Sequence, residues 1–273
     1  MTPERIASSG LLYLPALDYL RFPMRGEQSM TRSTNQSIAP LDAIDLWTVS
    51  LAGHVANESA TEVLSNEELS RAGRFVRESD RARYIASHRA LRRILARYSG
   101  DRPEQLWFER NVFGKPRLGN CAAIEFNMSH SGEIALIAVR TGGRVGVDVE
   151  EIRNHSANIE VAERYFAASE LQRLKSLDAN EQVAAFFRCW TRKEAYLKAM
   201  GCGISDEDLA MVEVTLLPDE PPAIVRGKMN GDAAELWTVF HVEPLQRYVG
   251  AVVAEGSDLR ISKKAWPVDQ KEA

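Results

Sequence analysis

The chain carries the same order of predicted elements twice, and this repetition strongly limits the folds it can adopt. Apolar residues recur at every second position in the expected strands and at every third or fourth in the expected helices. The first half is expected to contain strands at 46–51, 105–110, 123–127 and 134–139, a helix beginning near 65–68 and a long helix at 80–98. The second half is expected to contain strands at 145–150, 211–217, 236–242 and 248–254, and helices at 158–167, 169–177 and 181–200. No direct internal sequence repeat is present, so the duplication rests on element order alone.

This order predicts an α/β fold of the α+β kind. We expect a pseudo-twofold pair of similar lobes, each a small, mostly antiparallel sheet packed with a long helix, with the active site in the cleft between them. The expected divisions of the 273 residues are a poorly structured leader 1–40, an N-terminal lobe 41–143, a C-terminal lobe 144–256 and a loose tail 257–273. Two glycines within 141–144 predict a hairpin over 134–150. The pairs Ser65 with Glu68 and Ser169 with Gln172 have the spacing of helix capping boxes.

Charge and cysteine content narrow the class of protein. The net charge of −4 gives no indication of nucleic-acid binding. Segment 71–97 is nevertheless rich in arginine, with only Glu78 and Asp80 opposing, which is consistent either with a bound anion or with a solvated helix face. The three cysteines, at 121, 189 and 202, lack paired spacing and indicate a cytoplasmic protein. No apolar run reaches the length of a membrane span, and no secretory signal is present.

Three carboxylates are the candidate metal ligands. Because Val145, Val147 and Val149 alternate with Gly146, Asp148 and Glu150, a strand here places both carboxylates on one face. Glu194 falls within the apolar stripe of the 183–200 helix, where an unpaired charge would be costly. Oxygen ligands of this kind suit Mg²⁺. The alternative is a salt-bridged strand edge with a surface pair between Glu194 and Lys198; the place of Glu194 in the stripe favours a functional site.

Segment 126–131 supplies a second group of polar residues. His130 is expected at a turn between two strands, next to Ser129, Ser131 and Gly132, which offer donors to an oxyanion or a phosphate. A lone histidine is more often an ordinary surface residue. Lys198 lies one helical turn beyond Glu194 and could contact the same phosphate as a point charge.

Four segments together resemble those of phosphopantetheinyl transferases of the monomeric, two-lobed, surfactin-synthetase-activating type. The resemblance extends from about Arg71 to Ala254, and the segments are 114–116, 126–132, 146–150 and 190–199. It implies a transferase that moves the 4′-phosphopantetheine arm of coenzyme A to a serine of an apo acyl or peptidyl carrier protein. It also implies a monomer without nucleic-acid or membrane partners, and favours a role in secondary metabolite biosynthesis.

The resemblance also implies a role for each matching residue. Asp148, Glu150 and Glu194 would hold Mg²⁺, and Glu194, Lys198 and His130 would be catalytic. The residues expected to contact coenzyme A are Arg77, Arg83, Lys115, Pro116, Ser129, His130 and Lys198. Glu78 and Ser87 depart from the family pattern, which bears on coenzyme affinity rather than on the reaction.

Two other functions remain open from the sequence. One is a Mg²⁺-dependent phosphohydrolase that uses the same carboxylates, although the chain has no phosphate-binding glycine loop. The other is a non-catalytic relative that binds coenzyme A or a carrier protein. The intact set of Asp148, Glu150, Glu194 and Lys198 argues against this second alternative.

Overall fold

The computed structural model describes residues 40–53, 61–119, 121–152, 159–201, 206–227 and 234–267. The first half of the chain forms β1 (Ala43–Ser50), α2 (Asn66–Ala72), α3 (Glu78–Ser99), β2 (Phe108–Arg110), β3 (Pro116–Leu118), β4 (Ile124–Ser131) and β5 (Ile134–Thr141). The second half forms β6 (Val145–Glu151), α4 (Ile159–Tyr165), α5 (Ala168–Lys175), α6 (Ala179–Met200), α7 (Asp206–Met211), β7 (Glu213–Val214), β8 (Ile224–Arg226), β9 (Trp237–Val242), β10 (Tyr248–Glu255) and β11 (Arg260–Ala265).

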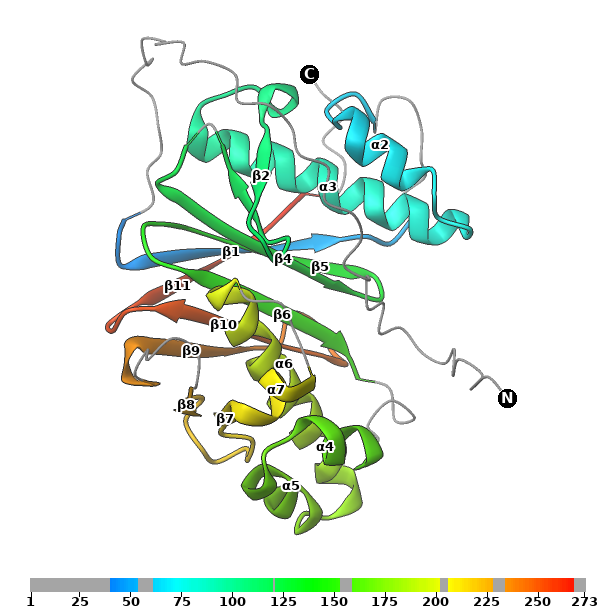
Figure 1. Cartoon of the computed structure of the whole chain (residues 1–273). Helices are drawn as coiled ribbons and strands as arrows, with labels where there is room; N and C mark the ends of the chain where they lie inside the picture. The colour runs from blue at the N-terminus through cyan, green and yellow to red at the C-terminus, as the bar shows by residue number, and fades with distance from the viewer. Residues whose placement is uncertain are drawn as a thin grey trace.

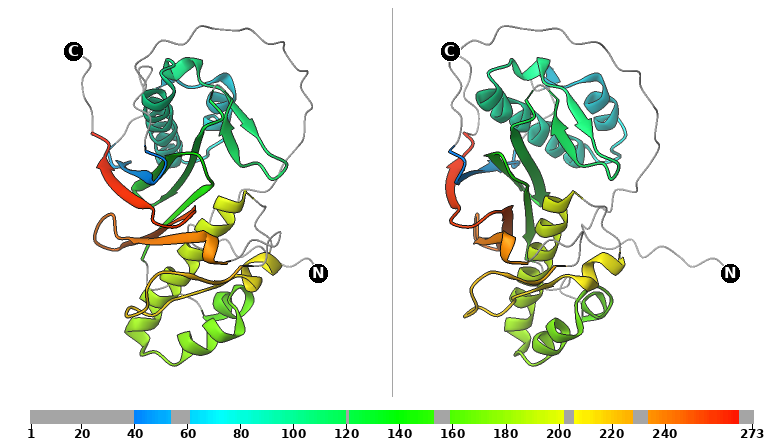
Figure 2. Two further views of the ribbon diagram at one scale, coloured as in Figure 1. Left: turned by 90° about the vertical axis from the view of Figure 1, so that its left-hand side faces the viewer. Right: turned by 60° about the vertical axis from the view of Figure 1, so that its left-hand side comes forward.

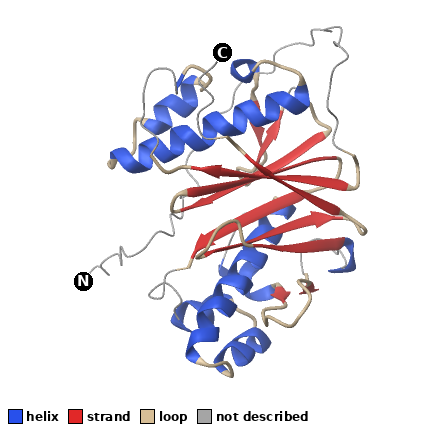
Figure 3. Ribbon diagram, turned by 180° about the vertical axis from the view of Figure 1, so that it is seen from behind, coloured by secondary structure: helices blue, strands red, loops and turns tan. Residues whose placement is uncertain are grey.

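The two halves share one topology, which confirms the predicted pair of similar lobes. In the first, β5 pairs antiparallel with both β1 and β4; in the second, β10 pairs antiparallel with both β6 and β9. Each lobe adds a two-stranded hairpin, β2–β3 or β7–β8, and a 22-residue helix, α3 or α6. The sheets meet in the middle of the molecule, with α3 on one side of them and α6 on the other (Figures 1 and 3).

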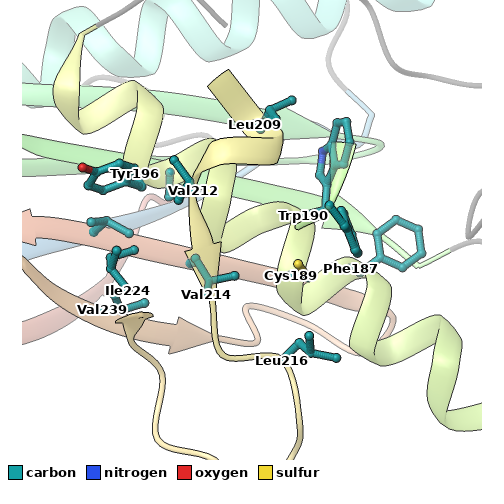
Figure 4. Close-up of a cluster of buried hydrophobic side chains, with 14 of the residues drawn as sticks. Phe187, Cys189, Trp190, Tyr196, Leu209, Val212, Val214, Leu216, Ile224 and Val239 are labelled. Carbon is teal, nitrogen blue, oxygen red and sulfur yellow. The ribbon is translucent and has the colours of Figure 1, made fainter. Parts of the chain in front are cut away.

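Apolar side chains fill three layers between these elements. Ile94 and Leu95 of α3 are fully buried against the N-terminal sheet. A middle layer, which includes the three valines of β6, lies between the two sheets. The third layer surrounds α6 and includes Trp190 and Tyr196 of this helix together with Val214 and Ile224 of β7 and β8 (Figure 4). Burial on this scale is the main force that orders the two lobes.

Local signals explain where the helices begin and end. Ser65 Oγ accepts the Glu68 N–H at 3.2 Å and Glu68 Oε2 accepts the Ser65 N–H at 2.7 Å, so the predicted capping box of α2 is confirmed. Helices α3 and α6 are each followed by a capping glycine, Gly100 and Gly201, whose φ angles of 76° and 67° suit glycine. Within the described ranges, no helix combines the length and apolar character needed to cross a membrane.

Two expectations about connectivity are wrong. The segment 134–150 is not a hairpin: β5 belongs to the first sheet and β6 to the second, because Gly142 and Gly143, with φ of 66° and 69°, carry the chain from one to the other. The tail 257–273 is not wholly loose either, since its residues 260–265 form β11. The leader 1–40, apart from residue 40, lies outside the described residues, as does Cys202.

Strand β11 returns to the N-terminal lobe and pairs parallel with β1 at the edge of its sheet (Figure 2). Lys264 Nζ donates to Asp45 Oδ2 at 2.7 Å, and the Trp266 ring packs edge-on against Trp47, with 5.9 Å between centroids. The sequence pattern did not predict this strand, because residues 260–265 are mostly polar and an edge strand needs little apolar surface. Two apolar residues of the strand, Ile261 and Ala265, and the tryptophan beyond it suffice.

Candidate active site

The site is built where α6 crosses β6 at very close range. An added Cβ at Gly146 would lie 2.1 Å from Ala195 O and 2.4 Å from Ala199 N, so only glycine allows this approach. The contact sets Lys198 of α6 above Asp148 of β6. It therefore explains why a glycine stands two residues before the aspartate.

The predicted carboxylates lie in one electrostatic cluster around Lys198. Lys198 Nζ donates to Asp148 Oδ1 at 2.6 Å and to Ser129 Oγ at 3.2 Å, and Ser129 Oγ donates to the same Asp148 oxygen at 2.8 Å. Asp148 and Glu194 are only 3% and 7% exposed, whereas Glu150 is half-buried. Among the described residues, Asp148 Oδ2 is buried without a hydrogen-bond partner. The structure thus leaves one acceptor of the cluster unused.

Burial and like charge shift the titration of these groups. Burial and the neighbouring Asp148 raise the pKa of Glu150 to about 8, against the opposing effects of Ser131 and Lys198. Burial raises the pKa of Glu194 to about 7, with Lys198 opposing and Asp148 adding to the rise. Burial alone would lower the pKa of Lys198, but Asp148 and Glu194 outweigh it and the net shift is upward. One ammonium faces three carboxylates, so the cluster favours an additional cation.

The chemistry of this cluster fits a hard divalent cation, although the side chains do not form a complete metal cage. Within the part of the chain that the structure describes, no group of three or more His, Cys, Asp or Glu side chains could hold a metal ion by itself. The donors are all oxygens, Asp148 Oδ2 is unpaired and the carboxylates are in excess. Mg²⁺, which keeps waters and takes phosphate oxygens of a substrate, is compatible with such an open set.

A basic surface adjoins the carboxylates. His130 follows Ser129 on β4 and is exposed; partial burial lowers its pKa, as do Lys198 and Arg83, whereas Asp148 raises it. Arg71 of α2 also lowers the pKa of His130. Positive groups from α2, α3 and α6 therefore surround the turn that ends β4, as an anion site requires.

The other residues predicted to contact coenzyme A lie on α3 and on the β2–β3 hairpin. Arg83 forms an ion pair with Asp80 at 3.2 Å, and Arg77 is exposed at the N-cap of α3. Pro116 opens β3. Lys115 is used within the protein: its Nζ donates to Val145 O at 3.2 Å and to Ala199 O at 3.1 Å, which ties the β2–β3 hairpin to the end of α6. Their roles toward a ligand stay predictions.

Sequence reasoning missed His88 and gave Asn127 no role, and it placed Arg71 and Ser131 in groups that could bind an anion without giving either residue a role of its own. Arg71 belongs to the basic surface, and His88 lies near it; burial lowers the pKa of His88 to about 3, with the Tyr84 carbonyl opposing, so its ring is uncharged near neutral pH, and it stacks on Tyr84 at 3.9 Å. Asn127 and Ser131 bind the backbone and side chains of β6. The alternation of Asn127, Ser129 and Ser131 was the available signal, since a period of two puts all three on one face of β4.

Comparisons with known proteins cover both lobes. Residues 144–253 match the model of the 4′-phosphopantetheinyl transferase superfamily, and residues 52–142 match that of the 4′-phosphopantetheinyl transferase N-terminal region. The chain is 36% identical over 219 residues to the 4′-phosphopantetheinyl transferase HetI of Nostoc sp., covering 79% of this chain and 89% of HetI. It is 36% identical over 148 residues to the 4′-phosphopantetheinyl transferase psf-1 of Bacillus pumilus, covering 54% of this chain and 62% of that protein.

Solved structures are also similar to part of the chain, among them a carrier-protein synthase. This one is the crystal structure of a holo-(acyl-carrier-protein) synthase from Bacillus anthracis in complex with CoA (3′,5′-ADP). The alignment has a TM-score of 0.32 and 26% identity, and it covers 42% of this chain and 96% of the synthase.

Proposed function

The chain belongs to the 4′-phosphopantetheinyl transferase superfamily, and we propose that it moves the 4′-phosphopantetheine arm of coenzyme A to a serine of an apo acyl or peptidyl carrier protein. The observation that carries this proposal is the cluster of Asp148, Glu194 and Lys198 where α6 crosses β6. All three lie within the C-terminal segment that matches the superfamily. The adjoining basic surface is of the kind that a phosphorylated coenzyme needs.

The reaction is a phosphoryl transfer, in which positioning and charge neutralisation provide most of the catalysis. The carrier serine oxygen forms a bond to the phosphorus that bears the pantetheine arm. The bond from that phosphorus to the bridging pyrophosphate oxygen breaks, and adenosine 3′,5′-bisphosphate leaves. The serine proton passes to a base at the site.

Each residue of the cluster has a role in this proposal. Glu194, with its pKa raised to about 7, accepts the serine proton directly or through a water molecule. Lys198, whose pKa is raised by its carboxylate neighbours, remains charged and donates to the pyrophosphate. His130 and Arg83 contact the phosphates of coenzyme A. Asp148, Glu150 and Glu194 would hold Mg²⁺, which when bound neutralises the charge of the leaving group.

We further propose that the protein acts as a cytoplasmic monomer on carriers of secondary metabolism. The free thiols of Cys121 and Cys189 suit a reducing compartment. The two lobes of one chain supply both strands at the boundary, β4 and β6, which supports a site formed within a single copy.

The test is incubation of the purified protein with coenzyme A, Mg²⁺ and an apo carrier protein, followed by intact mass measurement of the carrier. We expect a mass gain of one phosphopantetheine arm, and no gain for a carrier whose acceptor serine is replaced by alanine. Breakdown of coenzyme A without a carrier would instead support a phosphohydrolase. Binding of coenzyme A or carrier without transfer would support a non-catalytic relative.

A further inference from the structure

Strands β4 and β6 run side by side along the boundary between the lobes, yet they belong to different sheets. Hydrogen bonds from side chains of β4 join the two strands, in place of the backbone hydrogen bonds that join strands within one sheet. Asn127 Oδ1 accepts the Val147 N–H at 2.9 Å, and Ser131 Oγ accepts the Glu151 N–H at 3.1 Å. Between them, Ser129 Oγ donates to Asp148 at 2.8 Å. We call Asn127, Ser129 and Ser131 the polar stripe of β4.

Ser131 is the member of the polar stripe that contacts Glu150, and its hydroxyl, like that of Ser129, is fixed from both sides. Its single proton goes to Glu150 Oε2 at 2.8 Å, while its oxygen accepts the backbone N–H of Glu151. A hydroxyl that donates to one group and accepts from another cannot rotate without losing a hydrogen bond. The backbone of β6 therefore orients the Ser131 hydroxyl, and this hydroxyl in turn orients the Glu150 carboxylate.

The turn that follows Ser131 is held equally firmly. Gly132 has φ of 54°, and an added Cβ there would lie 2.6 Å from both Glu151 Oε2 and Tyr248 OH. Tyr248 OH accepts the Glu133 N–H at 3.1 Å, which joins the same turn to β10. These contacts hold the end of β4 against the C-terminal lobe and so fix the backbone position of Ser131.

We infer that Ser131 is a positioning residue that holds the Glu150 carboxylate in the orientation needed to bind a divalent cation. Metal-ligating carboxylates are themselves hydrogen-bonded, and such partners commonly affect metal affinity. The inference rests on the proposed function, since that function supplies the cation. It assigns Ser131 to the protein's own carboxylates rather than to a phosphate of coenzyme A.

The test measures metal binding rather than turnover. Mn²⁺, used as the probe, is titrated into the protein in the presence of coenzyme A and without carrier, and bound Mn²⁺ is followed by electron paramagnetic resonance. Ser131→Ala should weaken Mn²⁺ binding about 10-fold, and Ser131→Thr, which keeps the hydroxyl, should stay close to the wild type. Ser176→Ala serves as control, because Ser176 is exposed and its hydroxyl donates only locally, to Arg173 O.

A double-mutant cycle separates this role from a general structural one. In a Glu150→Gln background, Ser131→Ala should change Mn²⁺ affinity less than about twofold, because its effect passes through Glu150. Independent, additive effects would overturn the inference, as would wild-type Mn²⁺ affinity in Ser131→Ala or a wild-type protein that binds no Mn²⁺. If Ser131→Ala fails to fold by circular dichroism, Ser131→Cys, whose thiol is a weak donor, replaces it with the same expectation.

The inference and the proposed function can fail separately. A wild-type protein that binds Mn²⁺ but never modifies a carrier would refute the proposed function. The Mn²⁺ affinity of Ser131→Ala would still decide whether Ser131 positions Glu150. A wild-type protein that modifies carriers, with Ser131→Ala binding Mn²⁺ normally, would refute only the role of Ser131.

Discussion

Glu194 is a buried carboxylate whose neighbouring cation is already hydrogen-bonded to another carboxylate. It is almost fully buried, and its opposing cation, Lys198, already donates to Asp148. Burial consequently raises its pKa to about 7, against the effect of Lys198, so near neutral pH it can both accept and release a proton. A carboxylate with this property is suited to general base catalysis.

Replacing Glu194 by glutamine should separate catalysis from folding. The amide keeps the size of the side chain but cannot accept the serine proton, so we expect the transfer rate to fall about 10²–10⁴-fold with little change in the thermal midpoint. Single-turnover transfer to an apo carrier measures the effect. Glu163→Gln is the matched control, since Glu163 is half-exposed and pairs with Lys175 at the surface. A near-native rate for Glu194→Gln would exclude Glu194 as the base.

The raised pKa of Glu150 predicts how stability depends on pH without metal. Its pKa rises from 4.5 in the unfolded chain to about 8 in the folded protein, chiefly through burial. Between these values the folded state binds more protons than the unfolded state, so the Glu150 contribution to stability is present below about pH 4.5 and is lost as the pH rises toward 8. Urea unfolding in EDTA at about pH 5 and about pH 8 should show a smaller decline for Glu150→Gln than for the wild type. An equal decline in stability for the wild type and Glu150→Gln would show that Glu150 is not a group whose pKa rises on folding.

Contact between β6 and α6 decides the geometry of the site, and Gly146 permits it. Gly146→Ala would force a methyl group into the Ala195 carbonyl and separate the helix from the strand. We expect a loss of about 1–3 kcal/mol in the free energy of unfolding, together with a lower transfer rate, because Lys198 and Asp148 come from these two elements.

Gly73→Ala provides the control for that substitution. Gly73 has φ of −66°, and an added Cβ would meet its neighbours at an ordinary 3.5 Å. The change should be neutral or stabilise the protein by less than about 1 kcal/mol. Urea unfolding of both variants checks the pair of predictions, and equal costs at the two glycines would show that the close helix–strand contact is unimportant.

Helix boundaries show where sequence patterns succeed and where they fail. The capping box of Ser65 and Glu68 is confirmed, but that of Ser169 and Gln172 is wrong. Glu170 serves the start of α5 instead and accepts the Ala167 N–H at 2.7 Å. The same Glu170 carboxylate forms a buried ion pair with Lys193 at 2.6 Å, a partner far away in sequence that no local spacing reveals.

The assembly of the lobes was only partly predictable. The duplicated topology follows from alternating and helical patterns that each lobe carries locally. The cluster of Asp148, Glu194 and Lys198 was also expected, since family resemblance and the buried place of Glu194 agreed. The alternation along β4 could have revealed its polar stripe, but not the partners of the stripe on β6, and the docking of β11 could not be foreseen either, because both depend on pairing between strands that are not local in sequence. The expected phosphate contact of Ser129 remains a prediction, and its buried hydroxyl is hydrogen-bonded to Asp148.

Strand β11 should contribute measurably to the stability of the N-terminal lobe. Trp266 packs on Trp47, its backbone N–H donates to Thr48 O, and the Arg97 guanidinium lies 4.8 Å from its ring centre. Trp266→Ala should therefore cost about 1–2 kcal/mol. Lys263→Ala, an exposed position on the same strand, should change stability by less than about 0.5 kcal/mol. Thermal unfolding compares the two; similar effects would mean that Trp266 does not anchor the strand.

The pairing of β1 with β11 also has a consequence for how the protein is made. Lys264 follows its partner Asp45 by 219 residues, so the ribosome exposes one strand long before it delivers the other. Throughout that interval the outer edge of β1 lacks its neighbour and is open to wrong pairing between nascent chains. Translation speed and chaperone supply should therefore affect the yield of this protein more than its final stability suggests.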